Sequence, residues 1–177
     1  PWLNILDNCL LDLKINIILE VIFMEDIYEW KGLNGQLATF KKEVGDVEKI
    51  TFIGSPGVCT PFAEFMAYAV RDKQTHFIPL LNIDDCHQFE LKSYAMVLND
   101  EVSNPKDSDV VVLLGGLAMP KYDVDTDELN ALIDDILKED GRIIGVCYMD
   151  MFCKAGWPEK VNFDKIIDGT LIGVVKE

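Results

Sequence analysis

The sequence predicts one α/β domain, a three-layer α/β/α sandwich around a mostly parallel, doubly wound sheet. Short, continuous apolar runs end in glycine or turn residues, as the buried strands of a parallel sheet do. These runs alternate with segments of helical apolar spacing, which is the pattern of right-handed βαβ units. A chain of 177 residues is long enough for one full core and has neither internal repeats nor a linker, so we expect residues 1–177 to form a single domain.

The first 23 residues differ from the rest in their repetitive Leu, Ile, Asn and Asp texture. Residues 11–21 alternate like a strand, whereas Leu6, Leu10, Leu13 and Ile17 fit one helical face. The segment is either an ordinary first element or an N-terminal extension that precedes a natural start at Met24.

A helix is predicted from Leu33 to Val44, because apolar residues share one face and Gly45 follows at a position typical of a C-terminal cap. Residues 50–53 then form a short apolar run that predicts a buried strand. The sequence Gly54-Ser55-Pro56-Gly57 stops this strand and predicts a loop.

We expect Thr60 to cap the next helix, with Pro61 at its first position. Its predicted buried stripe consists of Phe62, Phe65, Met66, Ala69 and Val70. A second strand is predicted at residues 77–81. Residues 82–108 are the least regular part, with a short edge strand at residues 96–98.

The strongest strand pattern is at residues 110–114, which end in Gly115-Gly116. A helix closed by Gly141 is predicted next, with one face formed by Leu129, Leu132, Ile133, Ile136 and Leu137. Residues 143–147 are a further buried strand, and residues 171–175 are expected to be the last. The runs near residues 50, 77, 110 and 143 should lie side by side as parallel strands.

The charge of the chain limits its partners. Acidic residues outnumber basic ones by 31 to 16, giving a formal net charge of −15. Phosphate binding needs clustered Lys and Arg, so we expect neither a nucleic-acid partner nor an anionic membrane surface.

The five scattered cysteines indicate reduced thiols in a cytoplasmic protein rather than a disulfide framework. The apolar stretch at residues 10–24 is interrupted by Asp12, Lys14, Asn16 and Glu20, so it is too short for a spanning helix. It also lacks the basic start and the cleavage site of a signal peptide.

Unusual residues converge where three predicted strands end. Open α/β sheets bind ligands outside the carboxyl ends of their strands. Candidate ligand-binding residues at these ends are Gly54, Ser55, Gly57, Thr60, Gly115, Gly116, Leu117 and Tyr148. The Gly54–Gly57 loop either holds an anion at the helix start or serves as a structural turn; it lacks the Lys of a phosphate-binding loop.

Two cysteines are candidates for thiol chemistry. Cys59 lies at a predicted helix start, where the thiol pKa can be lowered, and the alternative is a buried structural cysteine. Cys147 ends a buried strand and precedes a possible sharp turn, which is the geometry of a nucleophile elbow. The alternative for Cys147 is also a core position.

No metal site is predicted. Asp123, Asp125 and Asp127 have calcium-loop spacing, but acidic residues at the positive end of a helix explain them better. The Cys86-His87 pair has no C-x-x-C partner motif.

The segment Ser108–Gly116, a helix, Gly141–Cys147 and then Ala155-Gly156 resemble the PfpI/ThiJ superfamily. That resemblance covers residues 48–157 and implies a flavodoxin-like fold, shared with class I glutamine amidotransferases, with Cys147 as the nucleophile. The chain from Met24 also resembles a family of uncharacterised proteins from methanogenic archaea.

Two departures from the PfpI/ThiJ pattern bear on function. The family follows its Cys with His-Gly, whereas this chain has Tyr148-Met149. Many members also place a Glu after the first strand, against the nucleophile, and the nearest positions here are Cys59 and Thr60. The resemblance therefore implies that Cys59 faces Cys147, where two thiols could form a reversible disulfide or share a metal ion.

The favoured interpretation is a non-catalytic small-molecule-binding or redox-sensing domain. The alternative is an enzyme of hydrolase or glyoxalase type that uses Cys147 on a small carbonyl or amide compound, with the Gly116 and Leu117 N–H groups as oxyanion donors. The cofactor stays open. The expected partner is a small-molecule ligand, and the oligomeric state stays open between a monomer and a homodimer.

Overall fold

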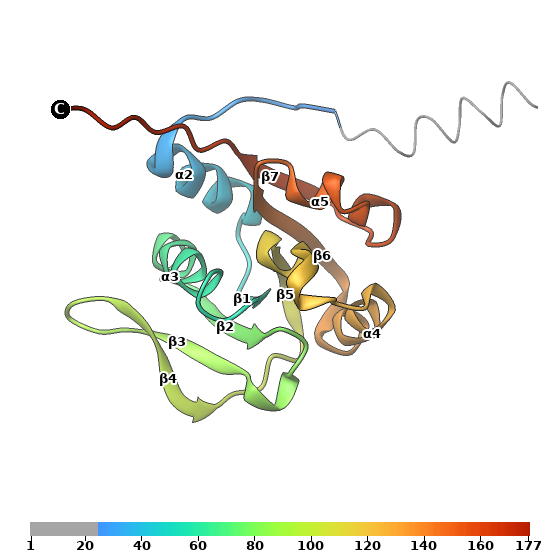
Figure 1. Cartoon of the computed structure of the whole chain (residues 1–177). Coiled ribbons are helices and arrows are strands. Elements are labelled where there is room, and N and C mark those ends of the chain that lie inside the picture. The colour runs from blue at the N-terminus through green and yellow to red at the C-terminus, as the bar shows by residue number, and fades with distance from the viewer. Residues whose placement is uncertain (1–24) are drawn as a thin grey trace, which may run out of the picture.

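The computed structural model of the protein describes residues 25–177, so the predictions for the first 23 residues lie outside the described range. Seven strands form one sheet in the order β4-β3-β2-β1-β5-β6-β7 (Figure 1). The strands are β1 Lys49–Gly54, β2 Gln74–Pro79, β3 His87–Leu91, β4 Met96–Val102, β5 Ser108–Leu114, β6 Leu137–Tyr148 and β7 Lys165–Gly169. The α-helices are α2 Gly32–Val44, α3 Thr60–Ala69, α4 Thr126–Ile136 and α5 Met151–Lys154. Four 3-10 helices complete the described elements: η1 Ile83–Asp85, η2 Gly115–Ala118, η3 Pro120–Tyr122 and η4 Trp157–Glu159.

The sheet is mostly parallel, as predicted. β1 pairs in parallel with β2 and β5, β6 pairs in parallel with β5 and β7, and only β3 and β4 run antiparallel to their neighbours. The registers Phe52↔Phe77, Ile50↔Val110 and Val111↔Ile143 confirm that the four predicted apolar runs lie side by side. After β1 the chain builds β2 on one side, and it later returns to the other side of β1 with β5. The order therefore reverses between β1 and β5.

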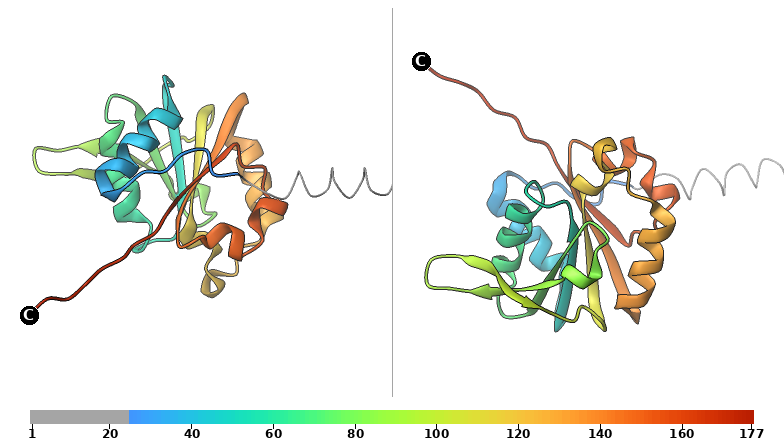
Figure 2. Two further views of the ribbon diagram at one scale, coloured as in Figure 1. Left: turned by 90° about the horizontal axis from the view of Figure 1, so that it is seen from above. Right: turned by 60° about the horizontal axis from the view of Figure 1, so that its bottom comes forward.

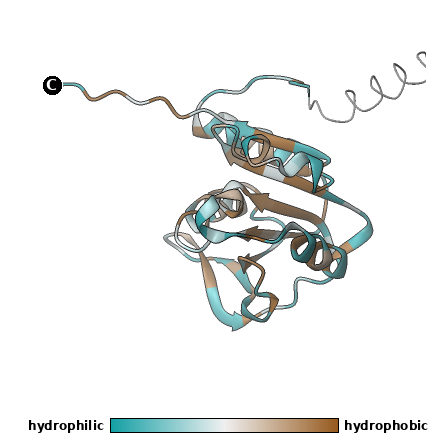
Figure 3. Ribbon diagram, turned by 45° about the vertical axis from the view of Figure 1, so that its right-hand side comes forward, coloured by the Kyte–Doolittle hydropathy of each residue, from teal (hydrophilic) through white to brown (hydrophobic). Residues whose placement is uncertain are grey.

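Helices cover both faces of the sheet (Figure 2). One core contains Phe40 of α2, Met66 of α3 and Val112 of β5, and the opposite core contains Ile133 of α4 and Phe152 of α5. Figure 3 shows apolar strands enclosed between helices that carry hydrophilic residues. This arrangement confirms the three-layer sandwich. Among residues 25–177, no helix is both long and apolar enough to cross a bilayer.

The start of α3 differs from the prediction. Thr60 is the first helical residue rather than the cap, and Cys59 occupies the cap position without a side-chain capping bond. Phe65 is 48% exposed, while the residues that face the sheet are Ala63, Met66, Ala67 and Val70. Ala63 and Ala67 let the helix lie close to the sheet. The predicted stripe, which consists mostly of large apolar side chains, does not include them.

Residues 82–108, predicted to be irregular, contain the antiparallel hairpin β3–β4 (Figure 1). The predicted strand at residues 96–98 is the start of β4, and β3 was missed. Only Phe89 is buried in β3, and only Met96 in β4. Edge strands with so few buried residues lack the continuous apolar run that predicts a central strand.

Two predicted boundaries near the C-terminus are wrong. Gly141 does not close α4, because α4 ends at Ile136 and β6 starts at Leu137 with Gly141 inside it. The last strand is Lys165–Gly169 rather than residues 171–175, whose large apolar side chains are 66–101% exposed. β7 is an edge strand with a neighbour on one side only. It includes Lys165 and Asp168, so it contains fewer apolar residues than the segment at residues 171–175.

Asp109 joins three strands at the amino end of the sheet. Its Oδ2 accepts hydrogen bonds from the backbone N–H groups of Glu48 (2.9 Å) and Lys49 (2.8 Å), and its Oδ1 accepts one from Lys138 Nζ. Partial burial acts to raise the pKa of Asp109, but the bonds from Lys138 and the two N–H groups outweigh it and lower the pKa. The charged side chain therefore holds β1 and β6 to β5.

We expect Asp109→Ala to lower the free energy of unfolding in urea by about 1–3 kcal/mol, because two backbone donors and one ammonium group lose their acceptor. Asp135→Ala is the matched control, since it removes one ion pair with Lys106 in which both side chains are 51% exposed. Such a pair contributes less than about 1 kcal/mol. Equal losses in the two variants would contradict the structural role given to Asp109.

Candidate functional site

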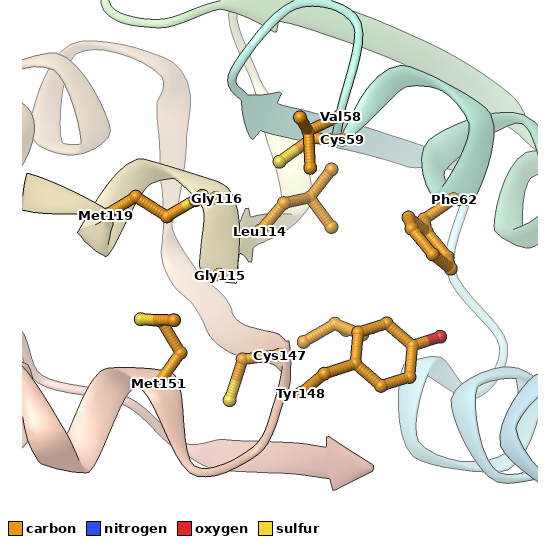
Figure 4. Close-up of a pocket in the computed structure, with 11 residues that line it drawn as sticks. Val58, Cys59, Phe62, Leu114, Gly115, Gly116, Met119, Cys147, Tyr148 and Met151 are labelled. Atoms are coloured by element: carbon orange, nitrogen blue, oxygen red, sulfur yellow. The ribbon is translucent and has the colours of Figure 1, made fainter. Parts of the chain in front are cut away.

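A pocket of about 140 Å³ lies at the carboxyl ends of β1, β5 and β6 (Figure 4). It sits beside the point where the strand order reverses, which is where open α/β sheets bind ligands. Its lining consists of Val58, Cys59, Phe62, Leu114, Gly115, Gly116, Met119, Val146, Cys147, Tyr148 and Met151. The sequence-based expectation for the position of the site therefore coincides with this pocket.

Five of the predicted site residues line the pocket: Cys59, Gly115, Gly116, Cys147 and Tyr148. The other five lie outside the lining. Gly54 and Ser55 are buried behind it, Leu117 belongs to the core beside α4, Gly57 lies on an exposed turn with a φ of 80°, and Thr60 starts α3.

Sequence reasoning missed the apolar part of the lining, namely Val58, Phe62, Leu114, Met119, Val146 and Met151. Such residues resemble core positions in the sequence, because nothing in an apolar side chain tells whether it faces a core or a cavity. Their one shared feature is their place next to the predicted strand ends. Every missed residue lies within four positions of a residue that the sequence did single out.

Gly115 and Gly116 allow neighbouring segments to approach β5 closely. A Cβ atom at Gly115 would lie 2.5 Å from Cys147 Cβ, and one at Gly116 would lie 2.5 Å from Ser55 Oγ and would also contact Cys59 Sγ. Real Cβ atoms essentially never come so near to another heavy atom. The absence of side chains here explains how both cysteines come to lie beside the end of β5.

Cys147 has a carboxylate partner that the sequence did not indicate. Its thiol donates a hydrogen bond to Asp168 Oδ1 over 3.1 Å, and the same oxygen accepts a bond from the Asp150 N–H over 2.9 Å. Cys147 is 2% exposed, and burial, followed by the hydrogen bond to Asp168 and the charge of Asp168, raises the pKa of its thiol to about 12. At neutral pH Cys147 is therefore a protonated thiol rather than a thiolate nucleophile.

The predicted nucleophile elbow does not lie at Cys147. β6 continues through Tyr148, and Cys147 is paired in register with Asp168 of β7. The positive φ angles come two residues later, at Met149 (59°) and Asp150 (61°). Because Cys147 sits inside a strand, its side chain is enclosed between the sheet and α5 and is not pushed out on a turn.

Cys59 does not meet Cys147. The Cys59 thiol shares a 3.2 Å hydrogen bond with Ser55 Oγ, whereas the Cys147 thiol bonds Asp168. The two residues pack in different cores, and the Cys147 sulfur points away from Cys59 (Figure 4). All four cysteines in residues 25–177 are free. The predicted convergence of two thiols is therefore absent from this part of the chain, because the Gly115-Gly116 segment lies between them.

Phe62 and Tyr148 form one wall of the pocket, with ring centroids 5.0 Å apart and an interplanar angle of 51°. The Tyr148 hydroxyl donates a 2.5 Å hydrogen bond to Oε1 of the buried Gln36 on α2. Each of the three residues comes from a different element, so α2, α3 and β6 together fix the orientation of this wall.

The weaker candidates have structural roles. Asp125 caps α4 by accepting a 2.7 Å bond from the Asp127 N–H, which confirms the helix-start interpretation. His76 Nδ1 bonds Ser103 Oγ at 2.8 Å, and His87 Nε2 lies 3.1 Å from Asp85. In the described residues, no group of three or more His, Cys, Asp and Glu side chains is arranged to hold a metal ion.

We expect iodoacetamide to label Cys147 at least about tenfold more slowly than Cys153 near pH 8, because reaction requires a thiolate with access to solvent. Cys153 is exposed, and the pKa of its thiol, which is raised to about 11, stays below that of Cys147. Because the pKa of Cys147 is about 12, its thiolate fraction grows about tenfold per pH unit between about pH 7 and 10. The labelling rate of Cys147 should therefore rise about tenfold per pH unit over this range, without a plateau.

Asp168→Asn should speed the labelling of Cys147 a few-fold, because it removes the negative charge and keeps an amide oxygen for the Asp150 N–H. Asp164→Asn is the matched control, since Asp164 accepts a bond from the Ile143 N–H at the other end of β7. Peptide mass spectrometry gives both rates. A plateau near neutral pH, or faster labelling at Cys147 than at Cys153, would contradict the protonated thiol.

Comparison with known proteins finds one family, two relatives and one solved structure that each match most of this chain. The family described as "Uncharacterized protein conserved in archaea (DUF2124)" matches residues 31–172. An uncharacterized protein from Methanothermobacter thermautotrophicus is 45% identical over 152 residues, covering 86% of this chain and 98% of the relative. One from Methanocaldococcus jannaschii is 40% identical over 152 residues, covering 85% and 92%. A crystal structure of a protein of unknown function from Methanothermobacter thermautotrophicus has a TM-score of 0.84 and 44% identity, covering 88% of this chain and 99% of that one. The chain therefore belongs to the DUF2124 family of archaeal proteins.

Proposed function

We propose that this protein is a non-catalytic small-molecule-binding domain that holds its ligand in the pocket at the ends of β1, β5 and β6. One observation carries the proposal: an apolar pocket lies at the strand reversal, and Cys147, which lines it from β6, is a buried thiol hydrogen-bonded to Asp168. The position favours ligand binding, and the state of the thiol disfavours catalysis.

The strand order supports the position of the ligand. The parallel strands run β2-β1-β5-β6-β7, which counted along the chain is 2-1-3-4-5, the order of flavodoxin-like sheets. In that arrangement the ligand binds between the first and third strands, here β1 and β5. The same order is compatible with the resemblance to the PfpI/ThiJ superfamily, which we retain as part of the proposal.

Cys147 has no histidine beside it that could act as a general base. The chain has two histidines, and they lie on β2 and β3, on the other side of β1 from Cys147. The nearest ionisable partner of the thiol is Asp168, and burial together with that negative charge raises the thiol pKa. The negative charge of Asp168 beside the sulfur disfavours the thiolate, which is the reactive form.

A Cys147-dependent enzyme is the second candidate, and the contact between Cys147 and Asp168 favours it. PfpI/ThiJ-like sites pair their nucleophile with a carboxylate, and the carboxylate hydrogen-bonded to Cys147 in this chain is Asp168 of β7. If this candidate is correct, Cys147→Ser should abolish turnover of a small dicarbonyl such as methylglyoxal. If the unaltered protein does not turn over methylglyoxal, the result supports the binding function over this candidate.

A redox role through Cys59 and Cys147 has less support. A disulfide needs Cα atoms within about 7 Å and Cβ vectors that point toward each other. The two thiols instead bond Ser55 and Asp168 and pack in different cores. A disulfide would therefore require the Gly115-Gly116 segment to move from between them.

Xenon tests whether the pocket admits a ligand, because it enters apolar cavities regardless of hydrogen bonding. Under xenon pressure we expect saturable shifts of the backbone amide resonances of Gly115, Gly116 and Tyr148. Val58→Trp should abolish these shifts, since Val58 lines the pocket and is 45% exposed, so a larger side chain fills the pocket at low cost in stability.

Val102→Trp is the matched control, because Val102 is 65% exposed on β4 at the far edge of the sheet. It should keep the xenon shifts. The absence of any saturable shift around the pocket in the unaltered protein would overturn the proposed function.

A further inference from the structure

The lining of the pocket contains no charged side chain. All eleven lining residues are apolar or uncharged, and the hydroxyl of Tyr148, the only one among them, already donates to Gln36. A charged ligand would lose its hydration without gaining an ionic partner, which is unfavourable. The net charge of −15 adds long-range repulsion for anions. The site therefore selects a neutral molecule.

The pocket has the size of a single ring. Its volume is about 140 Å³. An apolar protein cavity of about 150 Å³ accommodates benzene. A nucleotide or another large cofactor would have to extend out of this space into solvent. A ligand that is fully enclosed here has one six-membered ring and few additional atoms.

The lining is rich in sulfur and includes two aromatic rings. Cys59, Met119, Cys147 and Met151 are four of the eleven lining residues, and Phe62 and Tyr148 form one wall (Figure 4). Sulfur atoms make favourable contacts with aromatic rings, often at the ring edge. Two aromatic rings in contact also attract each other more than their buried area alone accounts for, so this lining favours an aromatic ligand over an aliphatic one of the same size. The two methionines are only partly buried, so their flexible side chains can adjust to a flat ligand.

We infer that the ligand is an uncharged, single-ring aromatic compound that packs against Phe62 and Tyr148 with the methionine sulfurs at its edge. This inference rests on the proposed small-molecule-binding function and specifies the chemical class of the ligand. The ligand is expected to be uncharged because the lining has no charged side chain, and to have one ring because of the pocket volume. It is expected to be aromatic because Phe62 and Tyr148 form one wall and four lining residues carry sulfur.

Three matched probes test the class. Benzyl alcohol is neutral and aromatic, cyclohexylmethanol is neutral and aliphatic with the same number of heavy atoms, and benzoate is aromatic and charged. Titrations followed by the amide resonances of Gly115, Gly116 and Tyr148 should give benzyl alcohol the lowest Kd, with cyclohexylmethanol about threefold or more weaker and benzoate about tenfold or more weaker. Val58→Trp should abolish the shifts, and Val102→Trp should keep them.

The double variant M119L/M151L tests the role of sulfur, because Leu keeps the apolar volume and removes both thioethers. The ratio of the Kd of cyclohexylmethanol to that of benzyl alcohol should fall toward one. An unchanged ratio would overturn the role assigned to the methionines.

The outcomes separate this inference from the proposed function. If xenon or cyclohexylmethanol binds in the pocket and benzyl alcohol binds no better, the aromatic class is wrong and the binding function stands. If benzoate binds as tightly as benzyl alcohol, the neutral class is wrong. If neither xenon nor any of the probes shifts the pocket amides, the proposed function itself fails.

Discussion

The close packing of backbone against side chain at the end of β5 is the constraint on which the site depends. Two consecutive residues without Cβ atoms, Gly115 and Gly116, let Cys147 approach from one neighbouring strand and Ser55 and Cys59 from the other. A side chain at either glycine would force these groups apart. The same segment separates the two thiols and forms the floor of the pocket, so one local property accounts for both the cavity and the lack of a disulfide.

The contact between Cys147 and Asp168 decides which chemistry the pocket can support. Asp168 is itself fixed by the Asp150 N–H, so the carboxylate cannot turn away from the thiol without breaking a backbone hydrogen bond. A protonated thiol in an apolar cavity behaves as a small hydrophobic group with a weak donor. Cys147 then contributes shape and polarizability to the site, in the same way as the two methionines.

Most of the sheet could be predicted from the sequence, because its central strands are buried on both faces and appear as continuous apolar runs. This holds for β1, β5 and the second half of β6. It holds only in part for β2, Gln74–Pro79, which begins with three polar residues and ends before the last two residues of the predicted run at 77–81. It fails for β3 and β7, which face solvent in part and carry residues such as Glu90 and Lys165. The tail at residues 171–175 has a stronger apolar pattern than β7 but lies outside the sheet.

The misplaced last strand also explains what was missed in the site. The pocket lies at the predicted strand ends, and five of its lining residues are among the candidates named from the sequence. Asp168 could not, since its link to Cys147 exists only through the pairing of β6 with β7 across 21 positions of sequence. Because the apolar pattern predicts the last strand at residues 171–175, Asp168 falls outside every predicted strand. The family pattern instead points to the position after β1, where Cys59 lies.

The outermost strand, β4, has one edge without a neighbour and ends in exposed acidic residues, Asp100 and Glu101. Two molecules that met along this edge would bring like charges together in chains that already carry a net charge of −15. Charged residues on edge strands prevent sheets from joining edge to edge. The hairpin thus protects an archaeal domain with long apolar strands from growing into a continuous intermolecular sheet.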